Sequence, residues 1–388
     1  NSDIITTHFE YHCMEANLLK LDELGHDDPT MIRMMEDMSE QLGERVDAQQ
    51  ISLSDPDTMS IFTSPAVLGL PDDDPIIGKT GSIGIPEFGT PFTRQMLVDT
   101  QPKQFDTLIR LSGFSHGTDV WAGNIHDLIV NGIANVNETV GCRDDIMLYL
   151  ISVGIEPSLA FKTMEAVRKG KVKKSGEFPG DAEQQMRDKG VPDWYIESCR
   201  KIAYLFPKAH AVAYVMMAFR IAWFKVHLPL AFYSAYFYRR SQKDGFDAES
   251  MLQGIDKCLA KINAIRRNPN ATAKEEDLLT TLEAVYEFYR RGFTFAPIDI
   301  YKSDSYKFLI EDGCLRPPFV AISGLGGSAA EDLKRAQDSG AKFVSIDDIS
   351  DACPKVSTAH LDMLRKLGAL GDLPETRQVS LFDAFGEM

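Results

Sequence analysis

The amino-acid sequence predicts a mainly α-helical fold with small α+β parts. Helical periodicity dominates from residue 105 to residue 230, and long polar helices are expected after residue 244. With 388 residues and 44% hydrophobic content, the chain can bury a large core, divided among two or three domains. Its six cysteines show neither C-x-x-C nor zinc-like spacing, so we expect no zinc site and reduced thiols in a cytoplasmic protein.

The first elements are expected to be a short strand, a turn and a helix. Residues 18–24 are rich in Leu with rough alternation, and residues 26–29, His-Asp-Asp-Pro, supply an N-cap and a first-turn proline for the helix. Asp22 would end the strand, where its carboxylate could bind Mg²⁺, although an acid in such a turn more often caps or is solvated. Residues 47–104 are rich in Pro, Gly and Asp and predict loops that link short elements.

The helices between residues 105 and 230 are expected to be interrupted at three places. Glycines predict a loop at 112–117, and Gly and Pro predict a break at 176–192. The third interruption is a run of basic residues from Arg168 to Lys174. This run is either a phosphate contact or a solvated face.

Residues 198–243 contain no Asp or Glu but eight Lys or Arg, in a chain of net charge -16. This local reversal predicts a surface that must not repel an anion. Nothing between Pro207 and Pro229 breaks a helix, and apolar residues recur on every face, so most of this helix is expected to be buried. Its longest apolar run, at 211–219, falls short of the ~20 residues that cross a bilayer, so no membrane span is expected.

The start of this helix could bind a phosphate group. Lys208 supplies a charge beside the free N–H groups and the positive end of the helix dipole. His210 and Tyr214 are four residues apart and share a face. A lysine that extends to solvent and a satisfied core histidine explain the same residues equally well. Arg143 is a weaker candidate, because its neighbours Asp144 and Asp145 could be its partners.

Residues 321–329 have the pattern of a helix-hairpin-helix. Its glycines would let backbone N–H groups approach a DNA phosphate, whereas the alternative is a plain glycine turn between helices. The phosphate-binding positions are Gly324, Gly326, Gly327 and Ser328. A related hairpin could lie at 364–371. Before these hairpins we expect a helix over 272–291 and short strands over 293–320, with small helices separated by glycine turns from 321 to 373.

Several long segments resemble the bacterial replicative DNA polymerase III alpha subunit, and specifically the PolC type of low-GC Gram-positive bacteria. They occur in the family's order along the whole chain. These segments are LLKLDELGHDDPT, GIPEFGTPFTRQML, SGFSHGTDVW, GCRDDIM, FPKAHAVAYVMMAFRIAWFKVH and GALGDLPETRQVSLF. The resemblance implies the C-terminal portion of the enzyme: the end of the palm (1–45), the fingers (46–291), a duplex-binding region (292–373) and a tail (374–388).

The resemblance also implies roles for individual residues. Asp22 matches the third metal-binding aspartate of the palm, and the first two would precede Asn1. The implied nucleotide-binding residues, which face the incoming dNTP, are Arg143, Lys208, His210, Tyr214, His116 and Thr118. The implied DNA-binding residues are Lys169, Lys171 and Lys173 together with the hairpin residues Gly324, Gly326, Gly327 and Ser328.

The tail 378–382, QVSLF, resembles the peptide by which bacterial replication proteins bind the sliding clamp. Leu381 and Phe382 would enter an apolar groove, while Gln378 and Ser380 complete the motif. The DnaE type of alpha subunit usually continues into an OB-fold domain, so a tail of this kind favours the PolC type.

The implied function is template-directed addition of deoxynucleotides to a primer 3′-hydroxyl, with two Mg²⁺ ions in the complete palm. The implied partners are primer-template DNA, dNTP, the sliding clamp and the remainder of the polymerase polypeptide, in a cytoplasmic replisome, with exonuclease activity elsewhere in the parent protein. We expect the chain alone to be inactive, because one carboxylate cannot hold two ions. The alternative is a non-catalytic module that binds DNA and tethers the clamp.

Overall fold

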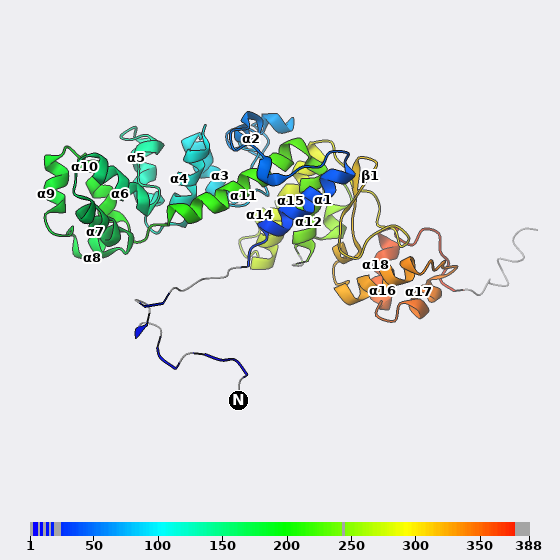
Figure 1. Cartoon of the computed structure of the whole chain (residues 1–388). Coiled ribbons are helices and arrows are strands. Elements are labelled where there is room, and N and C mark those ends of the chain that lie inside the picture. Colours follow the sequence, from blue (N-terminus) through cyan, green and yellow to red (C-terminus); the bar gives the residue numbers. More distant parts are fainter. Residues whose placement is uncertain are drawn as a thin grey trace, which may run out of the picture.

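The computed structural model describes residues 3–6, 8–10, 13–14, 17–18, 25–242 and 245–376. It confirms a mainly helical fold, and the molecule is elongated (Figure 1). The α-helices of the first two thirds are α1 Asp28–Gln41, α2 Pro56–Ser60, α3 Pro91–Thr100, α4 Phe105–His116, α5 His126–Val130, α6 Arg143–Ser152, α7 Pro157–Arg168, α8 Lys171–Ser175, α9 Ala182–Asp188, α10 Asp193–Lys201, α11 Lys208–His227 and α12 Pro229–Ser241.

The remaining helices are α13 Ala248–Met251, α14 Ile255–Arg267, α15 Ala273–Arg290, α16 Gly327–Asp338, α17 Ile346–Ala352 and α18 Thr358–Lys366. Strands β1 Leu309–Glu311 and β2 Cys314–Arg316 pair antiparallel, with Ile310 opposite Leu315. Short single-turn helices cover Ala48–Gln50, Ala66–Leu68, Trp121–Ile125, Val136–Glu138 and Phe319–Ala321. Helix α15 begins with a full capping box, in which Thr272 and Glu275 pair reciprocally, as its predicted start requires.

Two hydrophobic cores hold these elements. The larger core runs from α1 through α15 and takes in both strands. The smaller core gathers α16, α17 and α18 around residues such as Phe319 and Leu364. In Figure 1 the helices α5–α10 form one end of the molecule, α16–α18 form the other, and α11 extends from the first end into the centre.

The prediction of a loop at 112–117 was wrong, because α4 continues to His116. Gly113 sits inside this helix for a packing reason. A Cβ there would lie 2.2 Å from the carbonyl oxygen of Gly141, so the glycine allows the two backbones to touch. The strand predicted over 18–24 and the residue Asp22 that would end it fall almost wholly outside the described residues.

Helix α11 forms between the two prolines as predicted, but less of it is buried than expected. Within the described residues it is the one helix long and apolar enough to cross a membrane by length and composition, and 44% of its most apolar window is buried. Its second half carries most of the buried side chains, and the helix as a whole packs on α4, α12, α1 and α2. These contacts are those of a core helix with one end in solvent.

A buried ion pair fixes the second half of α11. Lys225 is fully buried, and its Nζ lies 2.7 Å from Glu287 Oε1 on α15. The same ammonium donates to the carbonyl oxygens of Gly81 and Ile83, at 2.7 and 2.6 Å. Burial lowers the pKa of Lys225 to about 8, while the Glu287 carboxylate opposes that shift. Lys225 therefore ties α11, α15 and the loop at 81–83 together.

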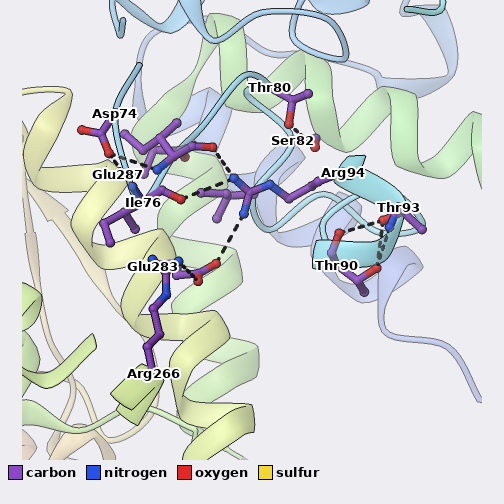
Figure 2. A network of polar contacts seen from close by, with 12 residues as sticks. Asp74, Ile76, Thr80, Ser82, Thr90, Thr93, Arg94, Arg266, Glu283 and Glu287 are labelled. Atoms are coloured by element: carbon purple, nitrogen blue, oxygen red, sulfur yellow. Dashed lines mark hydrogen bonds and ion pairs between the residues drawn. The ribbon is translucent and has the colours of Figure 1, made fainter. Parts of the chain in front are cut away.

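A second network fastens the preceding loop to α15 (Figure 2). The Arg94 guanidinium donates to the carbonyl oxygens of Ile76 and Ile77 and pairs with Glu283 at 3.4 Å. Asp74 accepts the N–H of Ile76 at 2.9 Å and pairs with Arg290 on α15 at 2.6 Å. A loop rich in Pro, Gly and Asp is thus held at several points by charged side chains.

We predict that Lys225→Met lowers the free energy of unfolding by about 3–5 kcal/mol, because it leaves Glu287 buried without its countercharge. Thermal unfolding followed by circular dichroism measures the effect. Lys162→Met, at an exposed position on α7, is the matched control and should change stability little. Equal stability of the two variants would contradict the prediction.

Candidate functional site

The helices α6 and α11 begin side by side, and acidic groups from α6 occupy the start of α11. The backbone N–H of Lys208 donates to Asp144 Oδ2 at 2.9 Å, and Lys208 Nζ lies 3.3 Å from Asp145 Oδ1. Asp145 also accepts the N–H groups of Gly141 and Cys142 at 3.0 and 2.9 Å. The end of α11 that was predicted to attract a phosphate group therefore already has two carboxylates as partners.

Arginines complete this cluster. Arg110 on α4 lies 3.4 Å from Asp145 and donates to the carbonyl oxygen of Thr139 at 2.6 Å. The Arg143 guanidinium lies 3.9 Å from Asp144, as the alternative role of that residue anticipated. Its side chain and that of Lys208 remain about one-third exposed, at 36% and 29%. The cations are balanced by acids yet accessible to a ligand.

A row of aromatic and imidazole rings lies on another face of the same helix start. His116 stacks on Phe206 with 4.9 Å between ring centroids, Phe206 contacts His210 at 5.1 Å, and His210 contacts Tyr214 at 4.3 Å. His26 meets Tyr214 at 4.7 Å and closes the row. Each of these five rings is at least partly exposed. The row therefore offers flat apolar faces to solvent beside the charged cluster.

Glu87 connects the two ends of the ring row. Its Oε2 lies 2.6 Å from His116 Nε2 and accepts the hydroxyl of Ser112 at 3.1 Å. Hydrogen bonding to Glu87 raises the pKa of His116, and the His116 imidazole lowers the pKa of Glu87 against the effect of burial. Burial raises the pKa of Asp28 to about 6, with His26 opposing and Glu87 adding to the rise.

The predicted nucleotide-binding residues thus fall into two groups that meet at Phe206. His116, His210 and Tyr214 belong to the ring row, whereas Lys208 and Arg143 belong to the charged cluster. Lys208 and His210 point to different sides because residues two apart do not share a helix face. The carbonyl oxygen of Phe206 accepts the N–H of Arg143 at 3.1 Å. Thr118 is exposed nearby and pairs through its backbone with Tyr204.

The predicted DNA-binding lysines lie at the end of α7 and on α8, where all three are exposed. Lys169 pairs with Glu165 at 3.0 Å, and Lys173 pairs with Asp119 at 2.5 Å. Lys171 forms no ion pair with any residue that the structure describes. These partners are consistent with a solvated face as much as with a phosphate contact.

The glycine hairpin precedes α16 as predicted. Gly324 has φ +83°, and a Cβ on Gly326 would meet no atom within 4 Å. Gly327 is needed for packing, because a Cβ there would lie 2.5 Å from the Tyr306 hydroxyl. Gly326 and Ser328 are exposed at the uncapped start of α16. The segment 364–371, by contrast, begins within the last turn of α18, and no helix follows it in the described residues up to 376.

Glu87 and Phe206, which contact the predicted site, were missed from the sequence, and Asp145 was considered only as a partner of Arg143 and not of Lys208. Glu87 lies 29 residues before His116, and Asp145 lies 63 residues before Lys208. No local spacing signals such pairs. Asp22 and the residues Gln378, Ser380, Leu381 and Phe382 lie outside the described residues. In the described part of the chain, no group of three or more His, Cys, Asp and Glu is placed to hold a metal ion.

Comparison with known proteins agrees with the sequence resemblance. The family model for the bacterial DNA polymerase III alpha subunit finger domain matches residues 28–190, and a helix-hairpin-helix model matches residues 292–380. Proteins named DNA polymerase III PolC-type are similar throughout. The identity is 49% over 98% of this chain for Caldanaerobacter subterraneus, 49% over 97% for Bacillus subtilis and 48% over 98% for Thermotoga maritima. The chain spans about a quarter of their lengths, namely 26%, 25% and 27%.

We predict that the pKa of His116 lies above its ordinary value of 6.5 and falls toward it in Glu87→Gln. Because the pKa of Glu87 is lowered from 4.5 and that of His116 is raised from 6.5, the ion pair makes its full contribution to stability from about pH 4.5 to 6.5. Its stabilising effect is lost below that window as Glu87 takes up a proton, and above it as His116 loses one. NMR titration of ¹³C-labelled histidine measures the His116 pKa in the unmodified chain and in Glu87→Gln. An unchanged His116 pKa in the variant would refute the pairing.

Proposed function

The chain belongs to the bacterial DNA polymerase III alpha subunit family and matches part of its PolC-type members, and on this premise we propose that it is the segment of a replicative DNA polymerase that binds the incoming nucleotide and the primer-template. The observation that supports this most is similarity over nearly the whole chain to polymerases of that name, with finger and hairpin matches in the same order. The reaction is template-directed addition of a deoxynucleotide to a primer 3′-hydroxyl.

Within this proposal the charged cluster and the ring row at the start of α11 contact different parts of the nucleotide. Lys208 and Arg143 neutralise the triphosphate, because they are the cations there with partly exposed side chains. The ring row of His116, His210 and Tyr214 lines the side that faces the sugar and base, and Thr118 borders it. Negative charge on the ligand would compete with Asp144 and Asp145 for these cations, so nucleotide binding requires the cations to leave these acids.

The proposal extends to residues outside the described part of the chain. Asp22 contributes one carboxylate to a palm that holds two Mg²⁺ ions, which stabilise charge on the reacting phosphate when they are bound. One carboxylate alone cannot hold both ions, so we expect no primer extension by the chain alone. The motif 378–382 binds the sliding clamp, and the protein works in the cytoplasm.

Lys208→Ala, in a complete polymerase that contains this segment, is expected to raise KM for dNTP about tenfold or more, because a charged hydrogen bond to phosphate is lost. The affinity for primer-template, measured by fluorescence anisotropy, should change much less. Lys162→Ala, exposed on α7, is the control that keeps both constants. The reverse pattern, with DNA affinity reduced and KM retained, would make Lys208 a DNA contact instead.

Gly326→Ala is expected to weaken binding of blunt duplex DNA without lowering the unfolding temperature. The added methyl group meets no protein atom within 4 Å, so a loss of affinity reports on the approach of a ligand to the start of α16. Gly25→Ala also adds a methyl group in open space and is the matched control. Unchanged duplex affinity at two salt concentrations would show that the hairpin does not contact the backbone there.

A further inference from the structure

A cavity of about 390 Å³ is lined by residues of α4, α6 and α10, among them Asp145, the partner of Lys208. Its size falls within the range of about 300–1,000 Å³ that is usual for sites of small ligands. The residues that define its character are Arg110, Thr139, Asp145, Tyr149, Trp194 and Tyr195. The nucleotide site proposed above uses none of the three aromatic residues.

The aromatic side of the cavity is built around Tyr195. This residue is 3% exposed, and its ring lies 4.6 Å from that of Tyr149 and 5.7 Å from that of Trp194, between centroids. The planes of the neighbouring rings are inclined to it by 48° and 67°. Tyr149 and Trp194 are both partly exposed. Two accessible rings therefore flank a buried one, as in a site that holds a flat molecule by stacking.

Two buried polar atoms beside these rings have no hydrogen-bond partner among the described residues. They are the hydroxyl of Tyr195 and the Nε of Arg110. The nearest acid to Arg110 Nε is Asp106, at 3.7 Å, which is beyond hydrogen-bonding distance. Buried donors without partners are uncommon in folded proteins. A ligand with an acceptor oxygen or nitrogen at its edge would supply what both atoms lack.

The charge of the cavity favours a neutral ligand. Asp145 has its negative charge shared among Arg110, Lys208 and two backbone N–H groups, and the exposed Glu138 lies on the wall. A phosphate group would meet Glu138 and find its one cation, Arg110, already paired. A neutral ring with polar edges meets no such repulsion.

We propose that this cavity takes one unpaired nucleobase of a single-stranded DNA segment. A base is flat, neutral and apolar on its faces, and its edge carries carbonyl and ring-nitrogen acceptors. These accept from the Tyr195 hydroxyl and the Arg110 Nε once the two side chains turn their buried donors toward the cavity. Stacking on accessible aromatic side chains is the general way in which proteins hold unpaired bases. The inference rests on the proposed function, because that function brings a single-stranded template to the molecule.

Photocrosslinking tests where the base lies. Primer-templates carry a single 5-iodouracil at successive positions of the template overhang, and the chain is irradiated with each and digested for mass spectrometry. We expect one overhang position to link to Tyr149 or Trp194. Links that fall only outside this cavity at every position would overturn the proposal.

Binding measurements test what the stacking contributes. Trp194→Ala is expected to weaken binding to a primer-template with a single-stranded overhang about tenfold, with blunt duplex binding unchanged. An abasic nucleotide at the crosslinked position should weaken binding of the unmodified chain to a similar extent, and it should remove any further effect of Trp194→Ala. Phe161→Ala is the matched control, because it removes an aromatic side chain that is 50% exposed on α7.

The outcomes separate the two proposals. Failure of the unmodified chain to bind blunt duplex DNA would count against the proposed function itself. Normal duplex binding together with full additivity of Trp194→Ala and the abasic site would overturn the nucleobase site alone. Tyr195→Phe keeps the ring and removes the hydroxyl, so it should preserve the fold and weaken overhang binding. An overhang affinity unaltered in both Tyr195→Phe and Trp194→Ala would leave the cavity to another ligand class and refute the assignment.

Discussion

The buried ammonium of Lys225 is the interaction on which the rest of the structure depends. It has no access to solvent, and it contacts one carboxylate oxygen of Glu287 and two backbone carbonyl oxygens at once. A buried charge is tolerated only with such complete pairing. Because its partners come from α15 and from the loop at 81–83, the side chain fixes their positions relative to α11. The first half of α11, most of which is half-buried, then extends from a rigid base.

The chain that follows the loop at 81–83 also positions part of the candidate site. Four residues beyond Ile83, Glu87 receives His116 from the end of α4, and His116 stacks on Phe206 at the entry to α11. The ring row is therefore positioned by a chain of contacts that begins at Lys225. The charged cluster is positioned independently, by the start of α6 against the start of α11. Two separate supports converge on one helix end, which explains how cations and flat rings lie so close together.

Local signals in the sequence predicted the elements well and the contacts between them poorly. The two prolines around α11, the capping residues of α15 and the glycines before α16 each determine a conformation within a few residues. Gly113 gave a wrong prediction of a loop, because a glycine is needed there for close contact with Gly141 and not for a turn. The pairing of Asp145 with Lys208 and the surroundings of Tyr195 gave no local signal, for the same physical reason. Their importance comes from residues distant in sequence that tertiary packing brings near, and periodicity carries no information about such pairs.

The absence of acids from 198–243 takes a different meaning in three dimensions. Arg200 pairs with Glu183, Lys208 with Asp145, Lys225 with Glu287, Arg239 with Asp27 and Arg240 with Asp277. The acids are thus missing from the segment because other segments supply them, and an anionic ligand is not required to explain the composition. Arg220 differs, since it forms no ion pair within the described part of the chain and its Nε is buried without a hydrogen-bond partner there. The charge pattern of the sequence therefore cannot show which of these cations contact a ligand. The ion pairs that each cation already forms do distinguish them.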